Sequence, residues 1–197
     1  LILEDANRED ILDSIYELRS IGKNDNILIY YSGHGYLDKE AETAYWQPID
    51  AKLNKPSSWI PESELKAQLK AIKAKHVIVI ADSCFSGAIL RGVEFTDIKE
   101  IKKKELIERN LKKRIRIAFT SGAEEPVLDS GGGNNSVFAK SFLDTLNALE
   151  EPIEGRYVHK KVVEKMIYNA KQQPQYNPIL NAGGERGGDF IFVPKAN

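Results

Sequence analysis

The chain has 197 residues, of which 42% are hydrophobic and 29% charged, as expected of one soluble domain with a sizeable core. Its net charge of −1 gives no bulk attraction to nucleic acid or to an anionic membrane, so we expect neither as a partner. One cysteine excludes a disulfide framework and a Cys-rich zinc site. No apolar run approaches the roughly 20 residues of a membrane helix, and we expect a cytoplasmic protein.

The first part of the chain alternates strand-like and helix-like segments. Leu1 to Leu3 is a short apolar run that predicts a strand, and a helix capped by Asp5 or Asn7 follows, with apolar residues at spacings of three and four. Ile27 to Tyr31 predicts the next strand. Residues 36–58 have no clear periodicity and predict an irregular stretch.

A second helix and a second strand continue this alternation. Pro61 is suited to the start of the helix, whose apolar residues again share one face. Val77 to Ala81 is a β-branched run without polar alternation, which is typical of a strand buried on both faces. The strand–helix–strand–helix–strand order predicts right-handed βαβ units on a parallel sheet.

The second half opens with a charged stretch, residues 93–114, which we interpret as an exposed insertion. Ile115 to Thr120 then predicts another strand. The remaining expected segments are a helix capped by Ser136, a helix with Val158 or Val162 and Met166 on its apolar face, a loop at Gln173 to Pro178, and a closing strand at Asp189 to Val193.

The candidate catalytic residues follow the ends of two predicted strands. Asp82, Ser83 and Cys84 follow the Val77 strand, and Ser-Gly-His-Gly, with His34, follows the Ile27 strand. Open α/β sheets hold their sites beyond the carboxyl ends of their strands. If the two strands are parallel neighbours, a thiol and an imidazole face each other there, which is the minimum requirement for nucleophilic catalysis by cysteine.

The ordered set of motifs resembles the caspase and metacaspase clan of cysteine proteases. His34 and Cys84 are 50 residues apart, close to the caspase spacing, and Asp-Ser before Cys84 is the metacaspase-like and bacterial form. The further segments that carry the resemblance are Gln47 to Asp50, which resembles the Pro-x-Asp segment, and Thr120 to Ala123, the Phe138 helix and Gly188 to Phe192, which resemble the small-subunit half.

The resemblance implies an α/β fold, a three-layer α/β/α sandwich around a mostly parallel sheet. It implies one catalytic domain over residues 1–197, with a large-subunit-like part at 1–92, an intersubunit-type insertion at 93–114 and a small-subunit-like part at 115–197. The first strand of the family, which lies between the counterparts of the Leu1 and Ile27 strands, is absent from this sequence, and we expect upstream sequence to supply it.

The resemblance also assigns roles. Cys84 would attack a peptide bond as a thiolate, and His34 would favour that thiolate and protonate the leaving amine. The N–H groups of Gly35 and Cys84 would form the oxyanion hole. The alternatives from the residues alone are a small buried hydrophobic residue for Cys84 and a strand-end histidine bonded to backbone for His34. The alternative for the whole chain is a catalytically inactive caspase-like scaffold or interaction domain.

Asp82 is the candidate specificity residue. A buried carboxylate two positions before the nucleophile would line the S1 pocket and attract Arg or Lys at P1, and metacaspase-like relatives with Asp there cut after basic residues. The alternative is that Asp82 caps the following turn through its own backbone. Asp50 would either line the same pocket or shape its loop.

Self-cleavage in the charged insertion is a further hypothesis, because this segment offers Lys and Arg residues to a protease that cuts after basic residues. The candidate sites are Lys104, Arg109, Lys113 and Arg114; the alternative is a solvated charged face.

The expected partners are a protein or peptide substrate and a regulatory or sensor domain, fused or separate. We expect no cofactor and no bound metal. Calcium activates many metacaspases, but the sequence contains no dense carboxylate loop that demands it.

Overall fold

The computed structural model describes residues 1–83, 103–122, 135–167 and 172–194. The helices are α1 (Arg8–Glu17), α2 (Glu62–Ala71), α3 (Lys103–Lys112), α4 (Val137–Asn147) and α5 (Gly155–Met166), with the short 3-10 helices η1 (Leu18–Ser20) and η2 (Pro56–Ser58). The strands are β1 (Asn26–Ser32), β2 (His34–Asp38), β3 (Thr43–Gln47), β4 (Ile60–Pro61), β5 (His76–Asp82), β6 (Ile115–Thr120), β7 (Ile153–Glu154), β8 (Gln175–Pro178) and β9 (Ile191–Phe192).

A mostly parallel sheet of four strands forms the centre of the molecule, in the order β1-β5-β6-β8. β1, β5 and β6 are parallel, and β8 is antiparallel to β6. Every residue of β5 and β6 is buried, as the uninterrupted apolar runs predict. The predicted strands at 77–81 and 115–120 are therefore confirmed.

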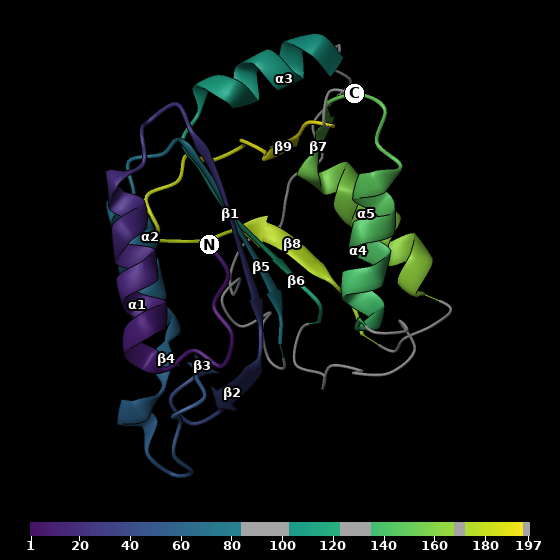
Figure 1. Ribbon diagram of the computed structural model, residues 1–197. Coiled ribbons are helices and arrows are strands. Elements are labelled where there is room, and N and C mark those ends of the chain that lie inside the picture. The colour runs from purple at the N-terminus through teal and green to yellow at the C-terminus, as the bar shows by residue number, and fades with distance from the viewer. Residues whose placement is uncertain (84–102, 123–134, 168–171, 195–197) are drawn as a thin grey trace.

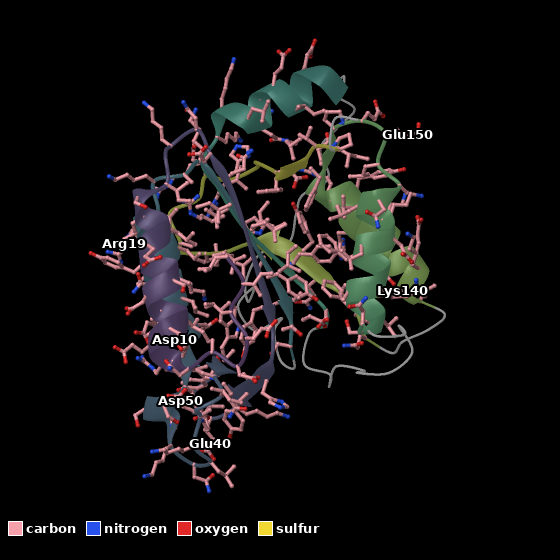
Figure 2. All side chains as sticks on the ribbon, in the orientation of Figure 1. Asp10, Arg19, Glu40, Asp50, Lys140 and Glu150 are labelled. Atoms are coloured by element: carbon pink, nitrogen blue, oxygen red, sulfur yellow. The ribbon has the colours of Figure 1, made fainter. Side chains whose placement is uncertain are left out.

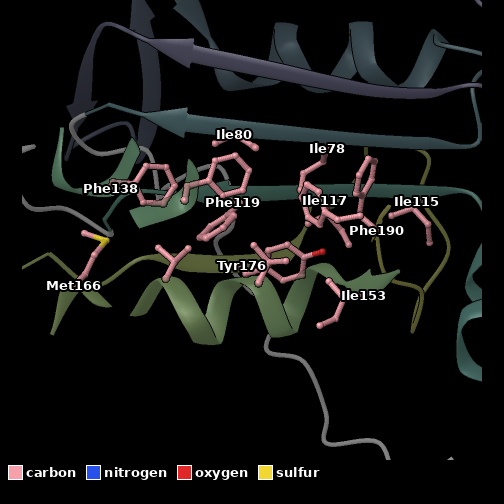
Figure 3. Packing of buried hydrophobic residues seen from close by; sticks show 14 of the residues in the cluster. Ile78, Ile80, Ile115, Ile117, Phe119, Phe138, Ile153, Met166, Tyr176 and Phe190 are labelled. Carbon is pink, nitrogen blue, oxygen red and sulfur yellow. The ribbon is translucent and has the colours of Figure 1, made fainter. Parts of the chain in front are cut away.

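Helices cover both faces of this sheet, which makes the fold a three-layer α/β/α sandwich. α1 and α2 lie along one face and α4 and α5 along the other (Figure 1). Because successive side chains of a strand point to opposite faces, Val77 and Val79 belong to the core with α1 and α2, whereas Ile78 and Ile80 belong to the core with α4 and α5. Figure 3 shows the second of these cores, in which aromatic rings pack around Phe119.

Arg116 is the largest polar side chain within the sandwich and is only 2% exposed. Its guanidinium group donates to the carbonyls that end α2 and to those of the turn that follows. The acceptors are the carbonyl oxygens of Leu69, Ile72, Ala74, Lys75 and Ile115. Burial lowers the pKa of Arg116 to about 10, which still leaves it charged at neutral pH. This cation therefore joins the end of α2 to β6.

Four sequence predictions need correction. Residues 36–58 are not wholly irregular: β2 and β3 form a hairpin that extends with β4 into a second sheet. The side chain of Asp38 closes the hairpin turn by accepting the N–H groups of Glu40 and Ala41. Leu1 to Leu3 form no strand.

The other two corrections concern the last part of the chain. The predicted loop at 173–178 contains β8, which tolerates Pro178 because it lies at the edge of the sheet. The closing strand is limited to Ile191–Phe192 and pairs with β7, so it does not join the central sheet.

β1 is the other edge strand, and within the described ranges it pairs with β5 alone. Beside it lies a groove of about 1060 Å³ whose lining includes Leu1 to Leu3, α1 residues and β1. None of the helices in the described ranges has the length and hydropathy that a bilayer crossing requires.

Candidate active site

The two motif-bearing strands are parallel neighbours, and their carboxyl ends are level. Ser32, the last residue of β1, is the register partner of Asp82, the last residue of β5. His34 lies two residues beyond Ser32, and Cys84 lies two residues beyond Asp82. The predicted adjacency of the two strands is thus confirmed as far as Ser32 and Asp82, and Cys84 itself lies outside the described residues.

His34 opens β2 directly after the turn at Gly33, and it is exposed. The hydroxyl of Tyr31 donates to the backbone carbonyl of His34 at 2.7 Å. A Cβ atom at Gly33 would lie 2.8 Å from that hydroxyl oxygen, so this close crossing requires glycine. The hydrogen bond from Tyr31 therefore stabilises the turn that leads to His34, and Gly33 leaves room for it.

Tyr31 is itself fixed by aromatic stacking. Its ring lies parallel to that of Trp46, with centroids 4.0 Å apart and planes 4° apart. Trp46 is the register partner of Gly35, the residue that follows His34. The stack therefore joins β1 to the β2–β3 hairpin beside His34. Trp46 is buried, and it also contributes to the lining of the groove beside β1. The predicted oxyanion-hole role of Gly35 stays a prediction.

Asp82 is buried, with 5% of its surface exposed, at the end of β5. Its Oδ2 atom accepts hydrogen bonds from the hydroxyl of Tyr30, at 3.2 Å, and from the hydroxyl of Ser136. Its Oδ1 atom is buried and has no hydrogen-bond partner in the described part of the chain. A buried carboxylate oxygen without a partner is costly, so this atom is a candidate contact for a cationic ligand.

The two donors to Asp82 come from different layers. Tyr30 lies on β1, and burial together with the Asp82 charge raises the pKa of its hydroxyl. Ser136 is the N-cap of α4, as predicted, and its Oγ accepts the N–H of Ala139 at 2.9 Å. No pattern in the sequence predicts their contacts with Asp82.

Asp50 contacts the start of α1. It is exposed, and its Oδ1 atom accepts the backbone N–H of Arg8 at 3.0 Å, at the first turn of α1. Figure 2 shows Asp50 at the same end of α1 as Asp10. This contact supports α1, as a carboxylate near a helix N-terminus does. A place for Asp50 in a substrate pocket stays a prediction.

The candidate cleavage sites lie at the opposite edge of the sheet. Lys104 and Arg109 lie in α3, and Lys113 and Arg114 lie between α3 and β6, close to where β5 and β6 begin. α3 is drawn far from β2 and β3 in Figure 1. A strand of this length spans roughly 20 Å, which separates these residues from the carboxyl edge.

Lys113 and Arg114 are also bonded to backbone. The Lys113 ammonium donates to the carbonyls of Arg186 and Gly187, at 2.8 and 3.1 Å. The Arg114 guanidinium donates to those of Lys70 and Ile72, both at 2.8 Å. Cleavage after either residue requires these bonds to break first, whereas Arg109 is exposed.

Comparison with known proteins places the fold and the motifs in one family. The model of the caspase domain family of peptidases matches residues 2–181. The chain belongs to this family.

Solved structures share the fold. Caspase-1 from Spodoptera frugiperda shares the fold with a TM-score of 0.63 at 13% identity, over 99% of this chain and 74% of that one. Protein GSU0716 from Geobacter sulfurreducens gives a TM-score of 0.58 at 18% identity, over 96% of this chain and 80% of that one. At these identities the likeness concerns the fold. None of the curated proteins compared with the chain matches it.

Proposed function

We propose that the chain is a cysteine endopeptidase that cuts after basic residues, with Cys84 as nucleophile and His34 as its acid–base partner. The observation that carries the proposal is the level register of Ser32 and Asp82, from which His34 and Cys84 each lie two residues away at one sheet edge. Membership of the caspase domain family supports the same assignment.

In the proposed reaction, the Cys84 thiolate attacks the carbonyl carbon of the scissile peptide bond and forms a carbon–sulfur bond. The C–N bond then breaks, and the leaving amine takes a proton from the His34 imidazolium. Water, deprotonated by His34, attacks the thioester and releases the new carboxyl group and the thiolate. The N–H groups of Gly35 and Cys84 would stabilise the oxyanion in both halves.

Asp82 would select the P1 side chain. Its carboxylate is buried, and one of its oxygens lacks a hydrogen-bond partner among the described residues. A guanidinium or ammonium group at P1 would supply that partner, and an acidic P1 residue would be repelled. Substrates of this enzyme would therefore be protein segments that carry an accessible Arg or Lys.

Covalent labelling tests this proposal. A peptidyl chloromethyl ketone with Arg at P1 alkylates a thiolate and adds one peptidyl group, with loss of chloride, to the mass of the protein. We expect one adduct on Cys84, no adduct in Cys84→Ala, and labelling at least tenfold slower in His34→Ala. A folded protein whose Cys84 reacts no faster than free cysteine would contradict the proposal and favour the scaffold alternative.

A further inference from the structure

Ser136 and Tyr30 together surround one oxygen of the Asp82 carboxylate. Both hydroxyls donate to Oδ2, whereas Oδ1 is left without a partner among the described residues. We infer that Ser136 and Tyr30 determine the choice between Lys and Arg at P1, because they leave Asp82 a single oxygen for the substrate cation. This inference rests on the proposed function and adds two specificity-determining residues to it.

The Asp82 carboxylate has a limited number of acceptor sites. A carboxylate offers about four lone-pair sites, two on each oxygen. Two hydroxyl donors fill both sites on Oδ2. An Arg side chain binds a carboxylate most strongly by a fork of two parallel N–H bonds, one to each oxygen. With Oδ2 occupied, that fork has only one free oxygen, and Arg is reduced to the end-on contact that Lys makes equally well.

A second hydrogen bond fixes the Ser136 donor, and the Tyr30 donor is placed by its strand. The Ser136 oxygen accepts the N–H of Ala139 as the N-cap of α4, so its single proton is directed to Asp82. Tyr30 lies on β1, two residues before the strand end, and its hydroxyl keeps its proton because burial and Asp82 raise its pKa. Ser136 cannot turn away from Oδ2 without loss of the α4 cap, and Tyr30 keeps its donor proton, so Asp82 has a single open oxygen among the described residues.

The expected consequence is weak discrimination in the parent protein and strong discrimination once a donor is removed. Without the Ser136 hydroxyl, Oδ2 regains a free site, and the bidentate contact with Arg becomes available. We expect the preference for Arg over Lys to rise roughly five- to tenfold. Removal of the Tyr30 hydroxyl, the longer of the two contacts, gives a smaller rise in the same direction.

Binding measurements in a Cys84→Ala background test this without any need for catalysis. Two peptides that differ only in a carboxyl-terminal Arg or Lys are titrated against the parent, Ser136→Ala, Ser136→Thr and Tyr30→Phe. Ser136→Thr is the matched control because it keeps the hydroxyl and the helix cap. Ser136→Gly removes the hydroxyl but costs the cap little, and it replaces Ser136→Ala if that variant does not fold.

Support would be dissociation constants within about threefold of each other for the parent and for Ser136→Thr, with the Arg preference raised in Ser136→Ala and Tyr30→Phe. An unchanged ratio in both hydroxyl-deficient variants would overturn the inference, while hydrolysis after basic residues would leave the proposed function standing. A parent that binds neither peptide would also overturn it, and the protease assignment would then rest on the labelling of Cys84 alone.

Discussion

Tyr31 and Trp46 lie face to face, with their ring centroids 4.0 Å apart, on the two elements that flank the candidate catalytic histidine. The Tyr31 hydroxyl extends from this stack to the carbonyl oxygen of His34. The stack therefore determines where the His34 backbone lies, although neither ring belongs to the motif that predicted the site.

Replacement of Tyr31 by Phe removes this hydroxyl and keeps the stack. We expect kcat to fall roughly three- to tenfold with KM changed less than twofold, because the imidazole loses its orientation while the substrate pocket is intact. Steady-state hydrolysis of a fluorogenic peptide measures both constants. Tyr45→Phe is the matched control, since the Tyr45 ring packs against Trp59 and lies outside the proposed machinery. Equal kinetics in the two variants would show that the Tyr31 hydroxyl does not position His34.

Self-cleavage in the charged insertion is predicted to occur between molecules. Arg109, Lys113 and Arg114 lie at the amino edge of the sheet, and the proposed nucleophile follows its carboxyl edge. The initial rate of fragment formation should therefore rise with the square of protein concentration, and active enzyme should cut an added Cys84→Ala chain.

Arg109→Gln should slow this cleavage most, because Lys113 and Arg114 are held by backbone carbonyls. Mass spectrometry of the fragments identifies the site. A rate per molecule that is independent of dilution, or cuts confined to Lys113 and Arg114, would contradict this prediction.

Arg116→Lys is expected to destabilise the fold by about 2–4 kcal/mol. A lysine offers three donors from one atom, so several of the buried carbonyls that now accept from the guanidinium group lose their partner. Urea denaturation followed by tryptophan fluorescence measures the loss. Arg186→Lys, at an exposed position, is the control and should change stability by less than about 0.5 kcal/mol. A loss at Arg116 no larger than that of the control would contradict the joining role of this side chain.

Stability is predicted to fall as the pH drops below neutrality. Burial lowers the pKa of both His76 and His159 from the ordinary value of 6.5. The unfolded chain therefore binds these protons at a higher pH than the folded protein does. The contribution of these two histidines to the free energy of unfolding is fully present above pH 6.5. It is lost as the pH falls from 6.5 toward their lower pKa in the folded protein.

The measurement is the free energy of unfolding in urea at several pH values between 5 and 8. The slope with pH should be smaller in the His76→Gln/His159→Gln double variant, because glutamine does not titrate. A double variant with the parent's slope would show that other groups control the acid sensitivity.

Local patterns were sufficient to predict β5, β6 and the N-cap of α4. The strands are continuous apolar runs, and Ser136 stands directly before an apolar helical face, so each prediction depended on neighbouring residues alone. The edge that carries His34 and Asp82 also followed from the chain, because strand ends in a parallel sheet meet at one edge.

Features that depend on distant partners were missed. β8 becomes a strand through pairing with β6, and Pro178 within it and Pro174 just before it concealed it. The contacts of Tyr30 and Ser136 with Asp82 join residues 52 and 54 positions apart, and no local pattern reports such a pair. The β2–β3 hairpin was missed because its first strand begins immediately after the turn at Gly33.

The most direct test of the central claim is hydrolysis of matched fluorogenic peptides with Arg, Lys or Asp at P1, by the parent and by Cys84→Ala, with and without calcium. We predict turnover of the Arg and Lys peptides by the parent and none by Cys84→Ala. Turnover confined to the Asp peptide would contradict the basic pocket at Asp82. Turnover of the basic peptides that survives in Cys84→Ala would contradict the assignment of Cys84 as the nucleophile.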